Sequence, residues 1–231
     1  MSSRDEYVKG VVLESRPYRE KDRMISFYSQ TKGKIIIFIR GGMRFSSKLA
    51  PMVSEPFALL NLKVVRGRHY YHLIGGEIIK SFKNIEKDYR RLLRLTETFQ
   101  NINKVLPRGE KNDNVYLLIK EFLNIINYKY SILIFISFII KLLCFLGFMP
   151  ELNKCLICKK SLSQGYFDIE NGGLVCKKHK TAKSFKLSND LLSLLQNLIF
   201  KSFKQLLLKD YSKKDILRAK HIIESFYSWQ V

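Results

Sequence analysis

The sequence predicts an α+β protein in which a small N-terminal β-barrel precedes an α-helical domain that carries an inserted metal-binding knuckle. Up to residue 82, apolar side chains alternate or form short blocks between turn signals, whereas beyond it the apolar period lengthens to nearly four. Between residues 151 and 182, two close pairs of Cys and His residues interrupt the helical pattern. We therefore expect a barrel domain at 1–82 and a helical domain at 83–231, with the knuckle inserted at about 151–182.

The composition is that of a globular protein with a polyanionic partner. The chain has 231 residues, of which 46% are apolar and 13% aromatic, enough for the cores of two modest domains. It carries 41 basic and 20 acidic residues, and each third of the chain is net positive. A net charge of +21 predicts binding to a polyanion such as nucleic acid. A genome-wide bias toward lysine is the alternative, but it explains clustered arginines less well.

About five strands are expected in the first domain. The extended segments lie at residues 6–13, 24–29, 34–40, 58–64 and 70–74, followed by 77–82. The charged stretch 16–23 is expected to be a loop, and the apolar run within 34–40 predicts a strand buried on both faces. Short strands with frequent turns favour a closed barrel. The OB-fold is the barrel of this size that commonly binds nucleic acid, and an SH3-like barrel is the alternative.

Helical periodicity covers most of the remaining chain. The expected helices lie at residues 85–106, about 113–127, 131–148, 188–209 and 212–229. Asp113 or Asn114 can cap the second helix and Ser131 the third, while Ser212 and Asp215 have capping-box spacing at the last. Because helices flank the knuckle on both sides, it should be an insertion in one helical domain.

The helix at 131–148 is apolar enough to raise the question of a membrane span. Its uncharged run, residues 130–140, is only about 16 Å long against a hydrocarbon core of about 30 Å. Lys129 and Lys141 bracket this run. We therefore expect a buried core helix, a protein without a membrane partner, and a buried side chain at Cys144.

Four side chains have the spacing of a zinc site: Cys155, Cys158, Cys176 and His179. Residues 165–169 and 174–175 are expected to form a hairpin that returns the second pair to the first. Because protein ligands fill all four positions, the zinc should be structural and not catalytic. Disulfides and a redox Cys-x-x-Cys pair are the alternatives, but neither a signal peptide nor a βαβ pattern accompanies the motif.

Basic residues in the loops of the barrel are the candidates for binding DNA phosphates. They are Arg16, Arg19, Arg23, Arg40, Arg44, Lys48, Arg66 and Arg68. Rings between these charges can stack on bases, although aromatic residues of small barrels are more often part of the core. These rings are Tyr18, Phe45, Tyr70 and Tyr71. The basic residues of the first helix, Arg90, Arg91 and Arg94, either extend the basic surface or form a solvated helix face.

Lysines also crowd the knuckle, where they balance the charge of three thiolates and one Zn²⁺ or contact DNA as a second role. They are Lys154, Lys159, Lys160, Lys177, Lys178 and Lys180. No catalytic constellation accompanies them: the remaining histidines have no nucleophile or carboxylate at a telling spacing, and no phosphate-binding glycine loop occurs. We expect a protein that is not an enzyme.

The chain resembles the RecO family of bacterial recombination mediators along nearly its whole length. In the barrel the matching residues are Arg16-Pro17-Tyr18 with Glu20 and Asp22, Gly33-Lys34, Gly41 through Arg44 with Ser47-Lys48-Leu49, Glu55-Pro56-Phe57 and Arg66-Gly67. In the helical domain they are Leu142-Leu143, Leu146-Gly147-Phe148, Pro150, Cys155 and Cys158. Each match is weak alone, but together they occur in the family's order across both domains.

The resemblance implies an N-terminal OB-fold, a helical C-terminal domain and an inserted zinc knuckle. It also implies a cytoplasmic, nucleoid-associated protein that binds single- and double-stranded DNA, anneals complementary strands and, with RecR, helps load RecA onto DNA coated by single-strand-binding protein. Two departures are evident. His179 stands where many members have a fourth Cys, and Ile and Phe replace the Ala and Leu that are common in the family's helices.

Two other functions fit the same features. A zinc-containing RNA- or ribosome-binding factor would use the same charge and barrel. A nuclease is the third candidate, although the filled metal site and the lack of a carboxylate cluster argue against it.

Overall fold

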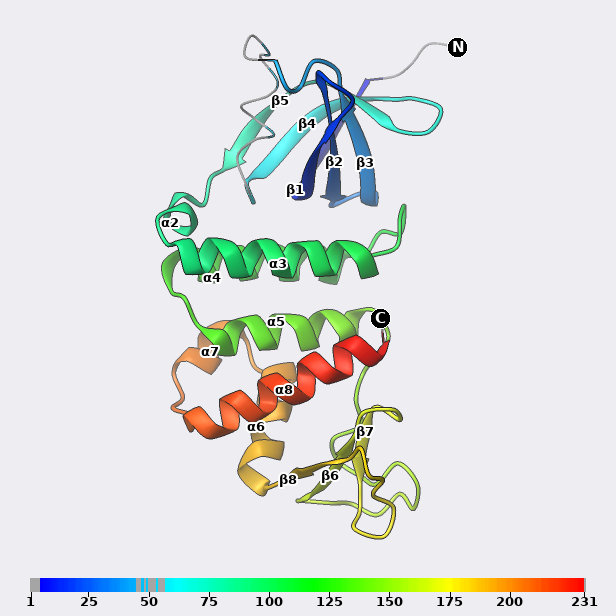
Figure 1. Cartoon of the computed structure of the whole chain (residues 1–231), viewed down its shortest axis with the longest axis vertical. Helices are drawn as coiled ribbons and strands as arrows, with labels where there is room; N and C mark the ends of the chain where they lie inside the picture. Colours follow the sequence, from blue (N-terminus) through cyan, green and yellow to red (C-terminus); the bar gives the residue numbers. More distant parts are fainter. Residues whose placement is uncertain (1–4, 45–46, 48, 50–52, 54–56, 231) are drawn as a thin grey trace. The chain divides into compact units, whose positions relative to one another are not determined.

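The computed structural model describes residues 5–44, 47, 49, 53 and 57–230, and the chain forms two compact units, Met1–Tyr128 and Lys129–Val231 (Figure 1). The first unit contains five strands that form a closed barrel in the order β1-β2-β3-β5-β4. They are β1 (Asp5–Tyr18), β2 (Asp22–Ser29), β3 (Gly33–Ile39), β4 (Leu59–Arg66) and β5 (Tyr71–Lys80). Among the described barrel strands, only β3 and β5 pair in parallel, and β1 closes the barrel by pairing with β4. The five-stranded, OB-fold-like barrel is confirmed.

Two strands run further than the sequence predicts. β1 continues through the stretch expected to be a loop, because Arg16 pairs with Met24 and Pro17 with Arg23. Outward-facing positions of a barrel strand face water, so a run of charges there does not end the strand. β5 likewise continues through Gly75 and Gly76 as one strand, opposite an irregular register in β4.

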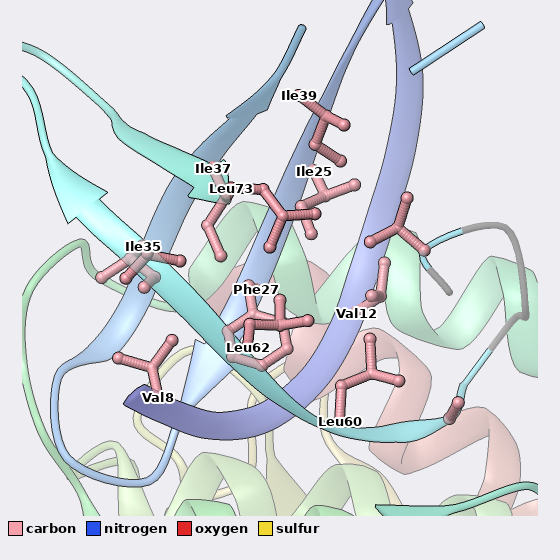
Figure 2. Packing of buried hydrophobic residues seen from close by; sticks show 13 residues of the cluster. Val8, Val12, Ile25, Phe27, Ile35, Ile37, Ile39, Leu60, Leu62 and Leu73 are labelled. Atoms are coloured by element: carbon pink, nitrogen blue, oxygen red, sulfur yellow. The ribbon is translucent and has the colours of Figure 1, made fainter. Parts of the chain in front are cut away.

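The core of the barrel consists of inward-facing side chains from all five strands, as Figure 2 shows. Ile25 and Phe27 of β2 and Leu60 and Leu62 of β4 are fully buried within it. On β3 the odd-numbered isoleucines 35, 37 and 39 are buried, whereas Ile36 and Phe38 are only half-buried. The expectation that this strand is buried on both faces is therefore wrong. The outer face of β3 therefore carries apolar side chains that are partly exposed to solvent.

The turn before β3 depends on a glycine. Gly33 has a φ of +63°, and an added Cβ would lie 1.9 Å from the backbone oxygen of Glu110, in the loop that follows helix α3 (Tyr89–Val105). The same loop is fixed to the barrel by the Gly109 amide, which donates to the Lys34 carbonyl at 2.9 Å.

We expect Gly33→Ala to lower the free energy of unfolding by about 2 kcal/mol or more, since it combines left-handed strain with a backbone clash. Gly109→Ala is the matched control. Gly109 also has a positive φ, +75°, but nothing lies within 4 Å of its added Cβ. Gly109→Ala should therefore lower the free energy of unfolding by about 1 kcal/mol, from the backbone strain alone. Urea unfolding of both variants measures the difference, and equal losses would show that the loop yields to the new methyl group.

Three described helices complete the first unit: α2 (Lys83–Glu86), α3 (Tyr89–Val105) and α4 (Asp113–Tyr128). The single helix expected at 85–106 is therefore wrong, because Asp88 interrupts it. The Asp88 side chain accepts a hydrogen bond from the Arg91 amide at 3.2 Å and so caps α3. Asn112, one residue before the expected caps, accepts from the Val115 amide at 3.1 Å at the start of α4.

In the described part of the second unit, three other helices accompany α5 (Ile132–Phe145), whose residues 133–138 are all buried. The other helices are α6 (Asn189–Phe200), α7 (Phe203–Leu207) and α8 (Lys213–Gln230). Inside this core the Ser137 hydroxyl donates to the Leu198 carbonyl at 2.7 Å. Among the described residues, no helix has both the length and the apolarity to cross a bilayer. The expected core helix is confirmed, although Cys144 is only half-buried.

The expected helix at 188–209 is two helices in the structure. Ser202 begins α7 with a full capping box, in which its hydroxyl accepts from the Gln205 amide and the Gln205 side chain accepts from the Ser202 amide. The predicted cap at Ser212 is confirmed by a 3.1 Å bond from the Asp215 amide to the Ser212 hydroxyl.

Candidate metal centre and nucleic-acid interface

The knuckle is built on a small sheet of strands β6 (Gly165–Asp168), β7 (Gly173–Val175) and β8 (Phe185–Leu187), in the order β7-β6-β8. The hairpin β6–β7 is the one that the sequence predicts, and its return strand leads directly to Cys176. The third strand, β8, has no counterpart in the sequence-based expectation. It is too short to show a period of its own.

Two tight turns present the candidate metal ligands. In the first, the Cys155 amide donates to the Lys160 carbonyl at 2.8 Å, and Lys159 adopts a left-handed conformation with φ +59°. In the second, the His179 amide donates to the Cys176 carbonyl at 3.0 Å. The hairpin between these turns brings all four side chains to one point.

The geometry of this cluster fits a tetrahedral metal ion. The four ligand atoms lie within 4.8 Å of one another. Nδ1 of His179 is 3.6 Å from Sγ of Cys155 and 3.3 Å from Sγ of Cys176, which is 4.0 Å from Sγ of Cys158. Tetrahedral Zn–S and Zn–N bonds of about 2.3 and 2.0 Å place their ligand atoms about 3.5 to 3.8 Å apart. His179 offers Nδ1, and the four cysteines of the chain form no disulfide.

The surroundings of Cys155 favour its thiolate form. Burial acts to raise the pKa of this thiol, but backbone amides of Cys158, Cys176 and Ile157 and the His179 side chain together lower its pKa to about 6. The Cys176 amide lies 3.4 Å from the Cys155 sulfur. Because a metal binds thiolates, this sulfur is prepared for a metal at neutral pH.

A buried carboxylate fixes the segment that follows His179. Asp168, at the end of β6, is 1% exposed and accepts hydrogen bonds at 2.9 Å from the Asn171 amide and at 3.2 Å from the Thr181 hydroxyl. The Ser184 hydroxyl adds a longer bond of 3.4 Å. Asp168 therefore ties the hairpin turn to residues 181–184 and positions the second pair of ligands.

We expect Asp168→Ala to lower the free energy of unfolding by about 2 kcal/mol, because it removes the hydrogen bonds that the buried carboxylate accepts from Asn171, Thr181 and Ser184. The matched control is Glu170→Ala, which removes the partly exposed ion pair with Lys183 and should cost under about 1 kcal/mol. Chemical unfolding followed at the knuckle measures both. An Asp168 variant as stable as the Glu170 variant would show that the carboxylate network does not hold this segment.

The outer face of the barrel carries a basic groove, made of two hollows of about 480 and 190 Å³ that share Lys34, Ile36 and Arg108. We call this the barrel groove. Arg66 and Arg68 line the larger hollow together with Tyr70 and Tyr71, and Arg16 lines the smaller one. Three of the eight predicted DNA-binding residues thus meet in one place.

The other predicted basic residues behave differently. Arg19, Arg40 and Arg44 are exposed near the turn between β1 and β2, and the Arg19 guanidinium lies 5.4 Å from the centre of the Tyr18 ring. Arg23 is half-buried and its guanidinium donates to the Ser15 hydroxyl at 2.8 Å, which indicates a structural role. Lys48 and the ring of Phe45 lie outside the described residues. On α3, Arg91 donates to the Asn127 carbonyl at 2.8 Å and is likewise structural.

Two further cations of the groove, Lys34 and Arg108, are not among the eight predicted DNA-binding residues. Lys34 is buried, and its ammonium donates to the Asn103 carbonyl at 2.6 Å. Burial lowers the pKa of Lys34, and the positive charge of Arg108 lowers it further. Arg108 reaches the groove because the loop after α3 lies against β3. No local signal in the sequence reveals that packing.

Rings also form a row on this face. Phe38 contacts Tyr18 edge-on at 5.8 Å between ring centres and His72 at 5.5 Å. Tyr18 was a predicted stacking candidate, whereas Phe38 and His72 were not. The alternation of β3, once its odd positions are assigned to the core, would have placed Phe38 outside.

Comparison with known families resolves the identity of this barrel and knuckle. Residues 1–82 match the family described as Recombination protein O N terminal, and residues 87–231 match Recombination protein O C terminal. The chain belongs to the RecO family. Together these matches cover almost the whole chain, so the resemblance found from the motifs is confirmed.

Individual relatives agree with this assignment. The DNA repair protein RecO of Caldanaerobacter subterraneus subsp. tengcongensis is 32% identical over 168 residues, which cover 71% of this chain and 67% of the relative. The protein of the same name from Thermoanaerobacter sp. is 30% identical over 167 residues, with the same coverage. That from Clostridium acetobutylicum is 30% identical over 164 residues, 69% of this chain and 65% of the relative.

Membership of the RecO family makes the chain a DNA repair and recombination protein. It also confirms the expectation that the protein is not an enzyme, since the family is one of non-enzymatic recombination mediators. The barrel groove brings several cations together, and the Cys₃His cluster could hold a metal ion.

Proposed function

We propose that this RecO-family protein binds and anneals single-stranded DNA and, with a RecR-like partner, helps load RecA onto DNA coated by single-strand-binding protein. Its place of action is the cytoplasm, at the nucleoid, and double-stranded DNA is a second ligand. The observation that carries the proposal is the barrel groove. It combines phosphate-binding cations and stacking rings on the barrel of a family that repairs DNA.

In this proposal the groove residues bind a single strand in two ways, by neutralising phosphates and by stacking on bases. Arg16, Arg66, Arg68 and Arg108 provide long cationic side chains that neutralise phosphates without reading sequence. Tyr18 and Phe38 provide ring edges and faces beside them, and such stacking contributes about 1 to 3 kcal/mol per base in single-strand binding. Sequence-blind contacts of this kind suit an annealing protein, which must act on any strand.

The predicted arginines near the turn between β1 and β2 extend this surface in our proposal. Arg19, Arg40 and Arg44 are exposed there. The segment Gly41–Arg44 is held to that turn by the Gly41 amide, which donates to the Asp22 carboxylate at 2.8 Å, and by the Met43 amide, which donates to the Lys21 carbonyl at 3.0 Å. Lys48 follows this segment.

The knuckle has a structural part in the same proposal. Cys155, Cys158, Cys176 and His179 hold one Zn²⁺, which fixes the two turns and leaves no coordination position for a reaction.

We also propose that residues 1–82 are the main DNA-binding domain and 83–231 the helical domain. Helix α3 and the loop after it lie with the barrel in one compact unit and supply Asn103 and Arg108 to its groove.

Annealing of complementary strands coated with single-strand-binding protein tests this function. We expect the purified protein to accelerate duplex formation. In a competition binding assay, single-stranded DNA should compete for the protein at least as well as structured RNA does. Preference for structured RNA, with no annealing, would favour an RNA- or ribosome-binding factor and contradict the proposal. Incubation of labelled DNA with Mg²⁺ should leave the strands uncut.

A further inference from the structure

The knuckle sheet has two different faces. Phe167 of β6 is buried and packs edge-on against Phe226 of α8, with 5.7 Å between ring centres. Its neighbour Tyr166 points to the opposite face, because successive side chains of a strand alternate. The register places Tyr166 directly opposite Lys186 of β8, so these two side chains share the outer face.

Two lysines, Lys180 and Lys186, lie beside Tyr166, and further exposed lysines lie in the metal-binding turns. The Lys180 ammonium lies 5.1 Å from the centre of the Tyr166 ring, which is half-buried. Lys160 ends the first metal turn and Lys178 lies within the second, and both are exposed. The two turns that carry these lysines meet at the candidate metal ligands, whose atoms lie within 4.8 Å of one another. We call Tyr166, Lys160, Lys178, Lys180 and Lys186 the knuckle face.

Charge balance at the metal does not account for so many lysines. Three thiolates and one Zn²⁺ carry a net charge of about −1, which a single lysine offsets. The nearby carboxylates have other partners. Asp168 is buried in its hydroxyl network, Glu151 accepts from the Asn153 amide at 2.8 Å, and Glu170 pairs with Lys183. In the described part of the chain, Lys160, Lys178 and Lys186 form no ion pair.

We infer that the knuckle face is a second nucleic-acid surface, which binds the backbone of another single strand and stacks a base on Tyr166. This inference rests on the proposed function: annealing requires two strands, and the knuckle face would bind the second one. A chain with two strand-binding surfaces holds two strands at a high effective concentration, and neither surface needs to read sequence. A half-buried ring among lysines is the arrangement that binds single strands without sequence preference.

A bridging experiment with the full chain, loaded with zinc, tests this inference. Oligo-dT is immobilised, the protein is bound to it, and a labelled free oligo-dT, which cannot pair with the first, is added. The variant is Lys160→Gln/Lys178→Gln/Lys186→Gln, with one change from each of three segments. We expect it to bind the immobilised strand nearly as well as the parent protein but to capture at least about tenfold less labelled strand, since three phosphate contacts are lost.

The controls separate charge from folding. Lys204→Gln/Lys213→Gln/Lys214→Gln removes three exposed lysines from α7 and α8 and should leave capture unchanged. The corresponding triple Lys→Arg variant of the knuckle face keeps the charge and should restore capture. Zinc content and unfolding of all variants are measured together with strand binding. The single variant Lys186→Gln changes a residue far from the metal ligands in sequence, and it should already reduce capture of the labelled strand.

The outcomes are distinguishable. A parent protein that fails to bind the immobilised strand contradicts the proposed function itself. A parent protein that binds the first strand but captures no second, or a knuckle variant that captures as much as the α7–α8 control, overturns the inference alone. Capture of an Asp- and Glu-rich peptide in place of the second strand would also overturn it and make the knuckle face a protein-docking surface.

Discussion

Cys155→Ser is expected to abolish metal binding and to unfold the knuckle while the barrel remains intact. Structural zinc in small fingers contributes about 10 to 16 kcal/mol of apparent free energy, which is folding free energy where no preformed site exists without metal. The knuckle has little else to hold it, because its sheet consists of strands of three or four residues. Metal analysis should find about one zinc per parent chain and none in the variant.

Cys144→Ser is the matched control for this change. Cys144 lies in α5, is half-buried, and burial raises the pKa of its thiol to about 11, so it is neither a ligand nor a reactive thiolate. This variant should keep its zinc. Hydrogen exchange should increase at residues 151–187 in the Cys155 variant only. A parent protein without zinc after purification in the absence of chelator, or a Cys155 variant that keeps its metal, would contradict the structural role.

The metal cluster is predictable from the sequence because its information is local. Two ligand pairs, each spaced to fit one turn, and a Gly-rich hairpin between them determine where the four side chains meet. The barrel was predictable for a similar reason, since inward positions such as Ile25 and Phe27 alternate with outward ones. The strand boundaries were not, because charges on an outward face resemble a loop.

The composition of the barrel groove could not be predicted, because it depends on contacts between segments far apart in sequence. Arg108 ends a helix in the sequence and enters the groove only through the docking of its loop on β3. Asn103 of α3 donates to the Glu14 carboxylate at 2.7 Å and accepts from the Ser26 hydroxyl at 2.6 Å. Tertiary packing brings these side chains into the groove, and no sequence motif predicts their positions.

The same packing leads to the prediction with the largest effect on DNA binding. We expect Arg16→Gln/Arg66→Gln/Arg108→Gln, with one change from each of three segments that line the barrel groove, to weaken single-strand binding by roughly 100-fold near 0.1 M salt. If these cations neutralise phosphates, log K falls linearly with log salt, and the slope should decrease by about 0.7 per contact, or about 2 in all. Titration of oligo-dT at several salt concentrations measures both quantities.

Lys83→Gln/Lys87→Gln/Arg90→Gln is the control, because it removes the same charge from exposed positions around α2 and the start of α3. Both triple variants should unfold within about 0.5 kcal/mol per site of the parent, as exposed charge changes usually do. Only the groove variant should flatten the salt dependence, since only its charges are arranged around one strand path. If both variants lost the same slope, binding would follow the net charge of +21 and not the groove, and the assignment of DNA to this face would be wrong.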